Sequence, residues 1–213
     1  MIGAAAIAAS LTGAAAVATA AADGPLEVVA LGDSLTAGYG LAEPDGFVPR
    51  LQAALAAKGV GATIANAGVS GDTAADGLAR LDWSVPEKTK AVIVELGAND
   101  MLRGIDPQQT RNALEAILKR LAARHIAVLL CGMRAAPNLG SAYGQAFAGI
   151  YPQLAAEYHV ALYPFFLDGA AANPQLTQRD GMHPNAAGVA VIVARILPQV
   201  EELIAHARAL PPS

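Results

Sequence analysis

Short apolar runs alternate with longer segments of helical spacing along the chain after residue 23. The apolar runs are bounded by glycine or polar residues, which is typical of buried strands. They predict strands at Leu26–Leu31, Ala62–Ala65, Ala91–Leu96, Ala127–Cys131 and Ala161–Tyr163. The segments between and after them predict helices at Phe47–Lys58, Thr73–Leu81, Pro107–Arg124, Tyr143–Tyr158 and Ala186–Ala207.

The segment after Asp106 carries the clearest helix signals. Asp106 is a good N-cap, and Pro107 suits the first turn of a helix. The apolar residues of one face follow at helical spacing: Leu114, Ile117, Leu118 and Leu121. Strands that alternate with such helices pair in parallel, in a sheet that is covered on both faces. The pattern therefore predicts an α/β fold.

Polar motifs follow the predicted strands. They lie at 32–34, 68–72 and 97–100, and another, at 180–183, precedes the last helix. Ligands of parallel sheets gather at the carboxyl ends of the strands. We therefore expect these motifs to share one edge of one sheet.

The motif residues Ser34, Asp180 and His183 supply the groups of a serine hydrolase, in the order Ser…Asp…His. A serine hydroxyl needs a base to take its proton, and the base needs a third group to orient it. Each residue also has a plainer interpretation. Ser34 could be an N-cap, and the loop 180–184 could be an ordinary surface loop or hold part of a metal site. No further ligand cluster accompanies the loop, so we predict no metal.

Asn99 and Gly71 could stabilise an oxyanion, through a side-chain amide and a backbone N–H respectively. Either alone would be interpreted as a turn former. The chain has no G-x-S-x-G nucleophile elbow. The stretch from Gly38 has Glu43 where a dinucleotide-binding G-x-G-x-x-G needs glycine, and no P-loop is present. We therefore predict no cofactor.

The composition of the chain limits the classes of partner that we expect. The 213 residues are 54% hydrophobic and 15% charged, with a net charge of −4. This balance, with no run of Lys and Arg, predicts no nucleic-acid partner. The single cysteine, Cys131, lies in an apolar run and is expected to be a buried strand residue.

The first residues differ from the rest. Residues 2–22 are uncharged and mostly alanine, and they end in A-x-A-like tripeptides. This predicts a signal peptide over 1–22, although no basic residue precedes the apolar stretch. A retained membrane anchor is the alternative. Residues 23–213 are expected to form one domain without a stable membrane span in the mature form.

At its motifs the chain resembles the SGNH-type (GDSL) hydrolases. The four blocks of that family correspond to residues 32–35, 68–72, 97–100 and 180–183. Segments around them are similar to the bacterial arylesterase and multifunctional acyl-CoA thioesterase/lysophospholipase subgroup. The resemblance implies a three-layer α/β/α, flavodoxin-like fold with a five-stranded parallel sheet. It also implies a role for each motif residue: Ser34 as nucleophile, His183 as base, Asp180 as orienting acid, and Ser34 N–H, Gly71 N–H and the Asn99 side chain as oxyanion hole.

The resemblance implies as substrates aryl and short-to-medium acyl esters, acyl thioesters and lysophospholipids, and a periplasmic or secreted location. Leu102 and Ile105 follow Asn99 directly, so the segment 101–106 is expected to line the acyl groove, although both side chains could simply cover the sheet edge. Two other functions stay open. A carbohydrate O-deacetylase could use the same residues, and a non-catalytic binding module belongs to another class.

Overall fold

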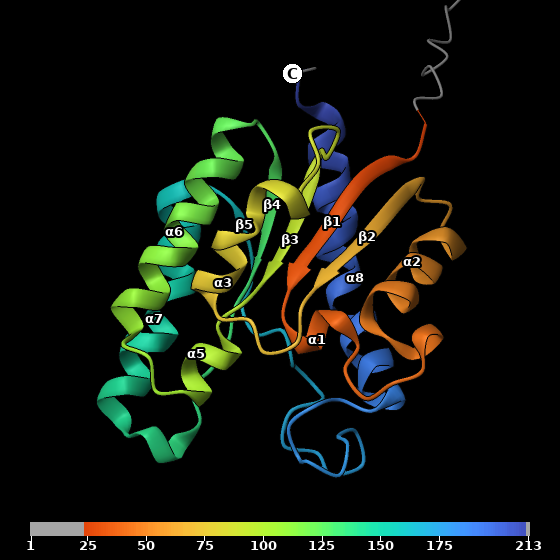
Figure 1. Cartoon of the computed structure of the whole chain (residues 1–213). Coiled ribbons are helices and arrows are strands. Elements are labelled where there is room, and N and C mark those ends of the chain that lie inside the picture. The colour runs from red at the N-terminus through yellow and green to blue at the C-terminus, as the bar shows by residue number, and fades with distance from the viewer. Residues whose placement is uncertain (1–23, 212–213) are drawn as a thin grey trace, which may run out of the picture.

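The computed structural model describes residues 24–211. Its sheet has five parallel strands in the order β2-β1-β3-β4-β5 (Figure 1). The strands are β1 (Leu26–Gly32), β2 (Ala62–Gly68), β3 (Ala91–Glu95), β4 (Ala127–Cys131) and β5 (Ala161–Tyr163). The chain passes from β1 to β2 on one side of it and then crosses to β3, β4 and β5 on the other side. The α/β/α class predicted above is confirmed.

The long helices form a layer on each side of the sheet. On one side α2 (Phe47–Ala57) packs against α8 (Ala186–Ala209). On the other side α6 (Pro107–Ala123) packs against both α3 (Ala74–Ala79) and α7 (Ser141–Tyr158). Figure 1 shows the two layers with the strands between them.

The core lies between these layers. Every residue of β3 and β4 is buried, as is nearly all of β1, whereas the edge strand β2 is half exposed. This is the burial expected where helices cover both faces of the middle strands. In α6, Asp106 caps the backbone N–H of Gln108, and the predicted apolar face is buried. Cys131 is buried, as predicted.

The structure differs from the predicted elements mainly near the motifs. The helix predicted at Thr73–Leu81 is two helices, α3 and α4 (Leu81–Ser84). They separate at Arg80, whose backbone leaves the helical region while its buried side chain turns inward. Four short helices were not predicted from the sequence: α1 (Ser34–Ala37), η1 (Glu43–Asp45), α5 (Ala98–Leu102) and η2 (Pro137–Leu139).

The predicted signal peptide at 1–22 lies outside the described residues. Among the helices within residues 24–211, none is long and apolar enough to cross a bilayer.

Candidate active site

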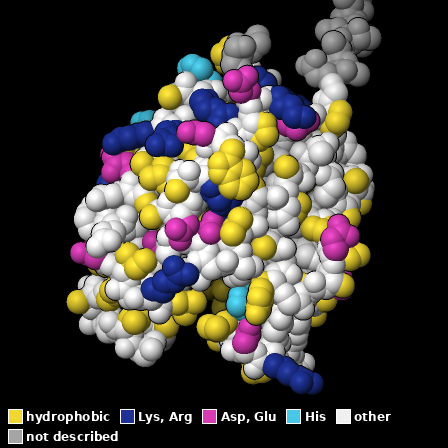
Figure 2. Space-filling model, viewed as in Figure 1, with side chains coloured by type: hydrophobic (Ala, Val, Ile, Leu, Met, Phe, Trp, Pro, Cys, Tyr) yellow, Lys and Arg dark blue, Asp and Glu magenta, His cyan; other side chains and the backbone are white. Residues whose placement is uncertain are grey.

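The carboxyl ends of the strands bring the predicted motifs to one edge of the sheet. The chain passes from β1 into α1, which begins with Ser34, and from β3 into α5, which holds Asn99. The loop before α8 carries His183 to the same place. In Figure 1, α1, α5 and this loop lie together below the arrowheads of the strands. Figure 2 shows a hollow there, where a histidine and an acidic side chain lie beside hydrophobic side chains.

Ser34, His183 and Asp180 form one hydrogen-bonded series. The Oγ of Ser34 lies 2.9 Å from Nε2 of His183, although the two residues are 149 positions apart. The other ring nitrogen, Nδ1, lies 2.6 Å from Oδ2 of Asp180. A hydroxyl, an imidazole and a carboxylate in this sequence can transfer the hydroxyl proton to the imidazole.

Asp180 is held as a carboxylate by its own loop. Its Oδ1 accepts the backbone N–H groups of Met182 and His183, at 2.9 and 3.0 Å. The hydrogen bond from Met182 and that from the His183 ring lower the pKa of Asp180 from 3.8 to about 2. An ionised Asp180 can only accept, so Nδ1 of His183 carries the proton of that bond. Nε2 is then left free to accept the proton of Ser34.

Backbone N–H groups lie near the hydroxyl without internal acceptors. Ser34 is the first residue of α1, and a helix cannot satisfy its first N–H groups. Within residues 24–211 neither the N–H of Ser34 nor that of Gly71 donates a hydrogen bond. Gly71 has a φ of +91°, which favours glycine. Its carbonyl accepts from the guanidinium of Arg103 at 2.6 Å.

The side-chain amide of Asn99 is fixed by two acceptors. Its Nδ2 donates to Oδ2 of Asp33 at 3.1 Å and to the carbonyl of Asp72 at 3.0 Å. Asp72 pairs with the buried Arg80, whose guanidinium also donates to the carbonyl of Gly32 and to Ser84. The ends of β1 and β2 and the start of α5 are thus joined by buried polar contacts. Sequence reasoning did not assign Arg80 or Asp33 to the site.

Two buried carboxyl groups lie beneath α1. Asp33 is fully buried and caps α1 by accepting from the N–H of Leu35 at 3.0 Å. Burial raises the pKa of Asp33 from 3.8 to about 6. Glu95, at the end of β3, accepts from Thr36 Oγ1 at 2.7 Å, and burial together with the charge of Asp33 raises its pKa well above 4.5. These two acids lie too close in a dry environment for both to ionise readily.

A groove of about 430 Å³ opens at Ser34 and His183. Ser34, Asn99 and His183 all line it, together with largely apolar side chains: Leu35, Ala98, Met101, Leu102, Met133, Phe165, Leu167 and Met182. Arg134 lies over the ring of Phe165 at the groove. Of the two residues predicted to bind the acyl chain, Leu102 lines the groove. Ile105 does not, and its carbonyl accepts instead from the hydroxyl of Tyr143.

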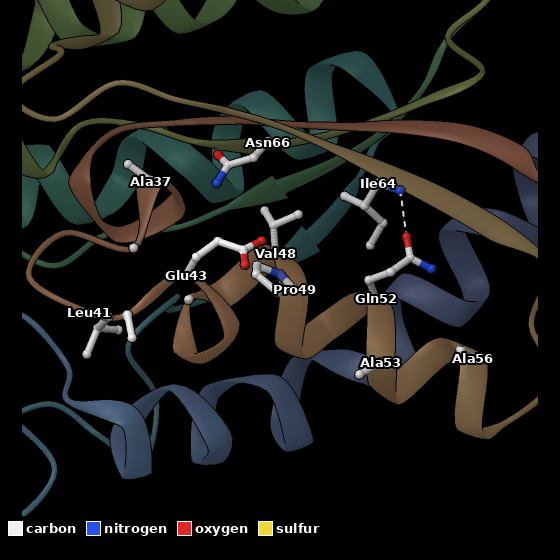
Figure 3. A pocket seen from close by; sticks show the side chains of 13 residues that line it. Ala37, Leu41, Glu43, Val48, Pro49, Gln52, Ala53, Ala56, Ile64 and Asn66 are labelled. Carbon is white, nitrogen blue, oxygen red and sulfur yellow. Dashed lines mark hydrogen bonds between the residues drawn. The ribbon is translucent and has the colours of Figure 1, made fainter.

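A second cavity, of about 680 Å³, lies between α1, α2 and the edge strand β2 (Figure 3). Glu43 and Asn66 are polar groups at its wall, and the amide of Gln52 bonds to both Ala62 O and Ile64 N of β2. The catalytic candidates do not line it. Among residues 24–211, moreover, no three His, Cys, Asp or Glu side chains cluster as metal ligands would. The groove, in contrast, is lined by both the candidate nucleophile Ser34 and its candidate base His183.

The comparisons with known proteins agree with this geometry. The sequence model of the GDSL-like Lipase/Acylhydrolase family matches residues 30–191. The chain belongs to the GDSL-like lipase/acylhydrolase family. A relative from Escherichia coli K12, thioesterase 1/protease 1/lysophospholipase L1, is 40% identical over 83% of this chain and 84% of its own. Esterase TesA from Pseudomonas aeruginosa is 38% identical over 83% and 89%.

The fold of this chain is also similar to that of a solved structure. The crystal structure of AlinE4, an esterase of the SGNH-hydrolase family, is 46% identical and matches with a TM-score of 0.72. The match covers 89% of this chain and 99% of AlinE4. The resemblance inferred from the four sequence blocks is confirmed.

Proposed function

We propose that this carboxylic ester hydrolase is a serine esterase with Ser34 as nucleophile, His183 as general base and Asp180 as orienting acid. The observation that carries the proposal is the hydrogen-bonded series from Ser34 Oγ through the imidazole to the carboxylate, open to an apolar groove. Of the described serines, Ser34 is the one whose hydroxyl bonds to a histidine. The family gives the reaction class, and this geometry supports the roles.

The reaction has two acyl-transfer steps. Ser34 Oγ attacks the ester carbonyl carbon as His183 Nε2 takes the hydroxyl proton. The imidazolium then gives this proton to the leaving oxygen or sulfur, and the bond from carbonyl carbon to leaving group breaks. Water, deprotonated by His183, attacks the acyl-serine, and the proton returns to Ser34 as the acid leaves. Asp180 stays ionised and stabilises the imidazolium.

The oxyanion of each tetrahedral intermediate is stabilised by three donors: the backbone N–H groups of Ser34 and Gly71 and the side-chain amide of Asn99. The unpaired N–H groups support the first two assignments. Asn99 lines the groove with Ser34, and its side-chain amide donates to Asp33 and to the backbone of Asp72, so the oxyanion shares one of these two N–H groups. Donors fixed in advance need no reorganisation when the charge develops.

The substrates we propose are aryl and short-to-medium-chain acyl esters, and also acyl thioesters or lysophospholipids. The wall of the groove is largely apolar and includes Leu102, which suits the binding of an acyl chain. The names of the relatives, an esterase and a thioesterase/lysophospholipase, point to the same small molecules. Ile105 acts in this proposal by anchoring the end of the 101–106 segment rather than by contact with substrate.

We also propose that the protein is periplasmic or secreted, on the evidence of the uncharged, alanine-rich segment 2–22. N-terminal sequencing of the protein purified from its native source tests this. A mature chain that begins near residue 23 supports export, whereas a chain that begins at Met1 contradicts it.

The test of the enzymatic proposal is hydrolysis of a panel of substrates by the wild type and by Ser34→Ala. The panel comprises aryl acetate to octanoate, an acyl-CoA, a lysophospholipid and an acetylated sugar. We expect hydrolysis of aryl esters and of at least one thioester or lysophospholipid, and loss of nearly all turnover in Ser34→Ala. Wild-type turnover by a folded Ser34→Ala variant would refute the assignment of the nucleophile. Hydrolysis of the acetylated sugar alone would refute the substrate class.

A further inference from the structure

The loop that carries His183 is closed mainly on itself. Thr177 and Pro184 form an isolated antiparallel bridge, and the N–H of Gln178 donates to the carbonyl of His183 at 2.7 Å. The N–H of Gly181 donates to the carbonyl of Gln178 at 3.0 Å. These contacts set His183 relative to Asp180. They do not set it relative to Ser34, which lies on a different element of the chain.

Besides the ring of His183 itself, the side chain of Gln178 connects this loop to the segment that follows Ser34. Nε2 of Gln178 donates to the carbonyl of Tyr39 at 2.7 Å and to the carbonyl of Pro184 at 3.0 Å. Tyr39 is tied to the nucleophile, because its N–H donates to the carbonyl of Ser34 at 3.0 Å. Pro184 directly follows His183. Gln178 therefore joins the residue after the base to a residue bonded to the nucleophile.

Two further contacts fit this connection. The ring of Tyr39 lies 4.7 Å from the imidazole of His183, centroid to centroid, at an interplanar angle of 40°. Gly40 has a φ of +74°, and a Cβ at that position would lie 2.2 Å from Oε1 of Gln178. The absence of a side chain at residue 40 thus leaves room for the amide of Gln178.

We infer that Gln178 is a positioning residue, whose amide, bonded to the carbonyls of Tyr39 and Pro184, holds the imidazole of His183 within reach of Ser34 Oγ. The inference rests on the proposed function, because it acts through Ser34 and His183. Gln178 does not contact the reacting atoms. Its two N–H groups serve both carbonyls, so a side chain of the same length without donors cannot replace it.

The experiment compares the kinetics of Gln178→Ala and Gln178→Glu with those of the wild type, on an aryl ester. A displacement of the base by about 1 Å can cost on the order of 10- to 100-fold in rate, so we expect both variants to lose kcat on this scale. KM should change by less than about threefold, because the groove is intact. The rate at which a fluorophosphonate modifies Ser34 should fall in parallel with kcat.

The matched control is Gln175→Ala, which removes an amide side chain from the same segment, with none of the contacts to Tyr39. It should keep wild-type kcat. Thermal unfolding of each variant identifies a loss of stability alone, since a merely structural Gln178 would lower Tm but leave the kcat of folded protein unchanged. Unchanged kcat and unchanged fluorophosphonate rate in Gln178→Ala, assayed well below its Tm, would overturn the inference, as would full kcat in Gln178→Glu.

A second measurement uses Gly40. At the φ of +74°, an alanine at residue 40 is strained in either background, but its methyl group displaces an amide only where Gln178 is present. Gly40→Ala should therefore lower kcat more in the wild type than in the Gln178→Ala background. Equal losses in both backgrounds would contradict the inference. Ser34→Ala, assayed in parallel, separates the two proposals. If it retains activity, the proposed function fails, whereas its inactivity together with an active Gln178→Ala defeats only the positioning role.

Discussion

At the scale of single residues, the candidate oxyanion amide is oriented before any substrate arrives. Asn99 has two N–H groups and two acceptors, one from Asp33 and one from the backbone of Asp72. Since both partners accept, the nitrogen and oxygen of the amide cannot exchange places without losing both bonds. An incoming oxyanion shares one of these two N–H groups, in an amide whose orientation is already fixed, so little reorganisation is needed when its charge develops.

Asn99→Ala should lower kcat by on the order of 10²- to 10³-fold, the usual loss for one oxyanion donor. The substrate is held by the groove, so KM should change little. Steady-state kinetics on an aryl ester measure both values. Asn112→Ala is the control, because Asn112 lies in α6 away from the groove and bonds to Gln108. A loss below about tenfold in Asn99→Ala would contradict the role of the amide.

At the scale of elements, the nucleophile lies on a helix of only four residues, α1. A helix of this length is not stable by itself, and its geometry therefore depends on its neighbours. Asp33 caps its start, Gly38 ends it with a φ of 81°, and Thr36 bonds to the buried Glu95 of β3. The position of Ser34 therefore follows from the sheet below it rather than from any local propensity.

The length of each element decides whether it could be predicted from the sequence. The strands and long helices were predicted to within a few residues, because their apolar patterns extend over enough positions to show a period. α1 and α5 are shorter than two helical turns, so no period exists to be detected. Serine, histidine and asparagine were recognised as candidates by residue type and motif. Gln178 and Arg80 were not, because their roles come from contacts between distant segments.

The end of α5 should influence the choice of acyl chain. Leu102 is 55% exposed and lines the groove, so Leu102→Ala removes apolar surface that a long chain would cover. At about 0.8 kcal/mol per buried methylene, kcat/KM for octanoyl esters should fall about three- to tenfold relative to acetyl esters. The measurement is the ratio of the two values across acetyl, butyryl, hexanoyl and octanoyl esters.

Trp83→Ala is the control for that series. Trp83 is an exposed apolar residue of α4 outside the groove, so its removal should leave the ratio unchanged. An unchanged ratio in Leu102→Ala would show that Leu102 only covers the sheet edge.

At the scale of the whole molecule, the reactive edge is built over buried acids. Asp33 and Glu95 lie beneath α1, which carries Ser34, and burial raises the pKa of both. Asp180, in the exposed loop, has a lowered pKa. The two kinds of group affect stability in opposite directions and in different pH ranges. The buried pair contributes least to stability when ionised, whereas Asp180 contributes only while ionised.

The stability of the wild type should therefore fall as pH rises from about 4 to about 6. The pKa of Asp33 is 3.8 when unfolded and about 6 when folded, so the folded state binds more protons in that range. Asp33→Asn cannot ionise, and the fall should be smaller in this variant, by on the order of 2 kcal/mol. Urea unfolding between pH 4 and pH 7 measures the difference. Asp82→Asn, an exposed site, serves as control, and an equal fall in the wild type and Asp33→Asn would contradict this account.

The stability of the protein should also decline at low pH, because Asp180 becomes protonated there. Its pKa is lowered to about 2, so its contribution is complete above pH 3.8 and is lost as pH falls toward 2.

The most direct test of the central claim is covalent labelling with a fluorophosphonate, followed by mass spectrometry of the intact protein and of its peptides. The claim is that His183 activates Ser34 as the nucleophile. We expect one adduct per chain, located on Ser34, that forms at the same rate as hydrolysis is lost. The adduct should be absent from Ser34→Ala and should form far more slowly in His183→Ala. An adduct on another serine, or complete loss of hydrolysis with Ser34 unmodified, would contradict the account.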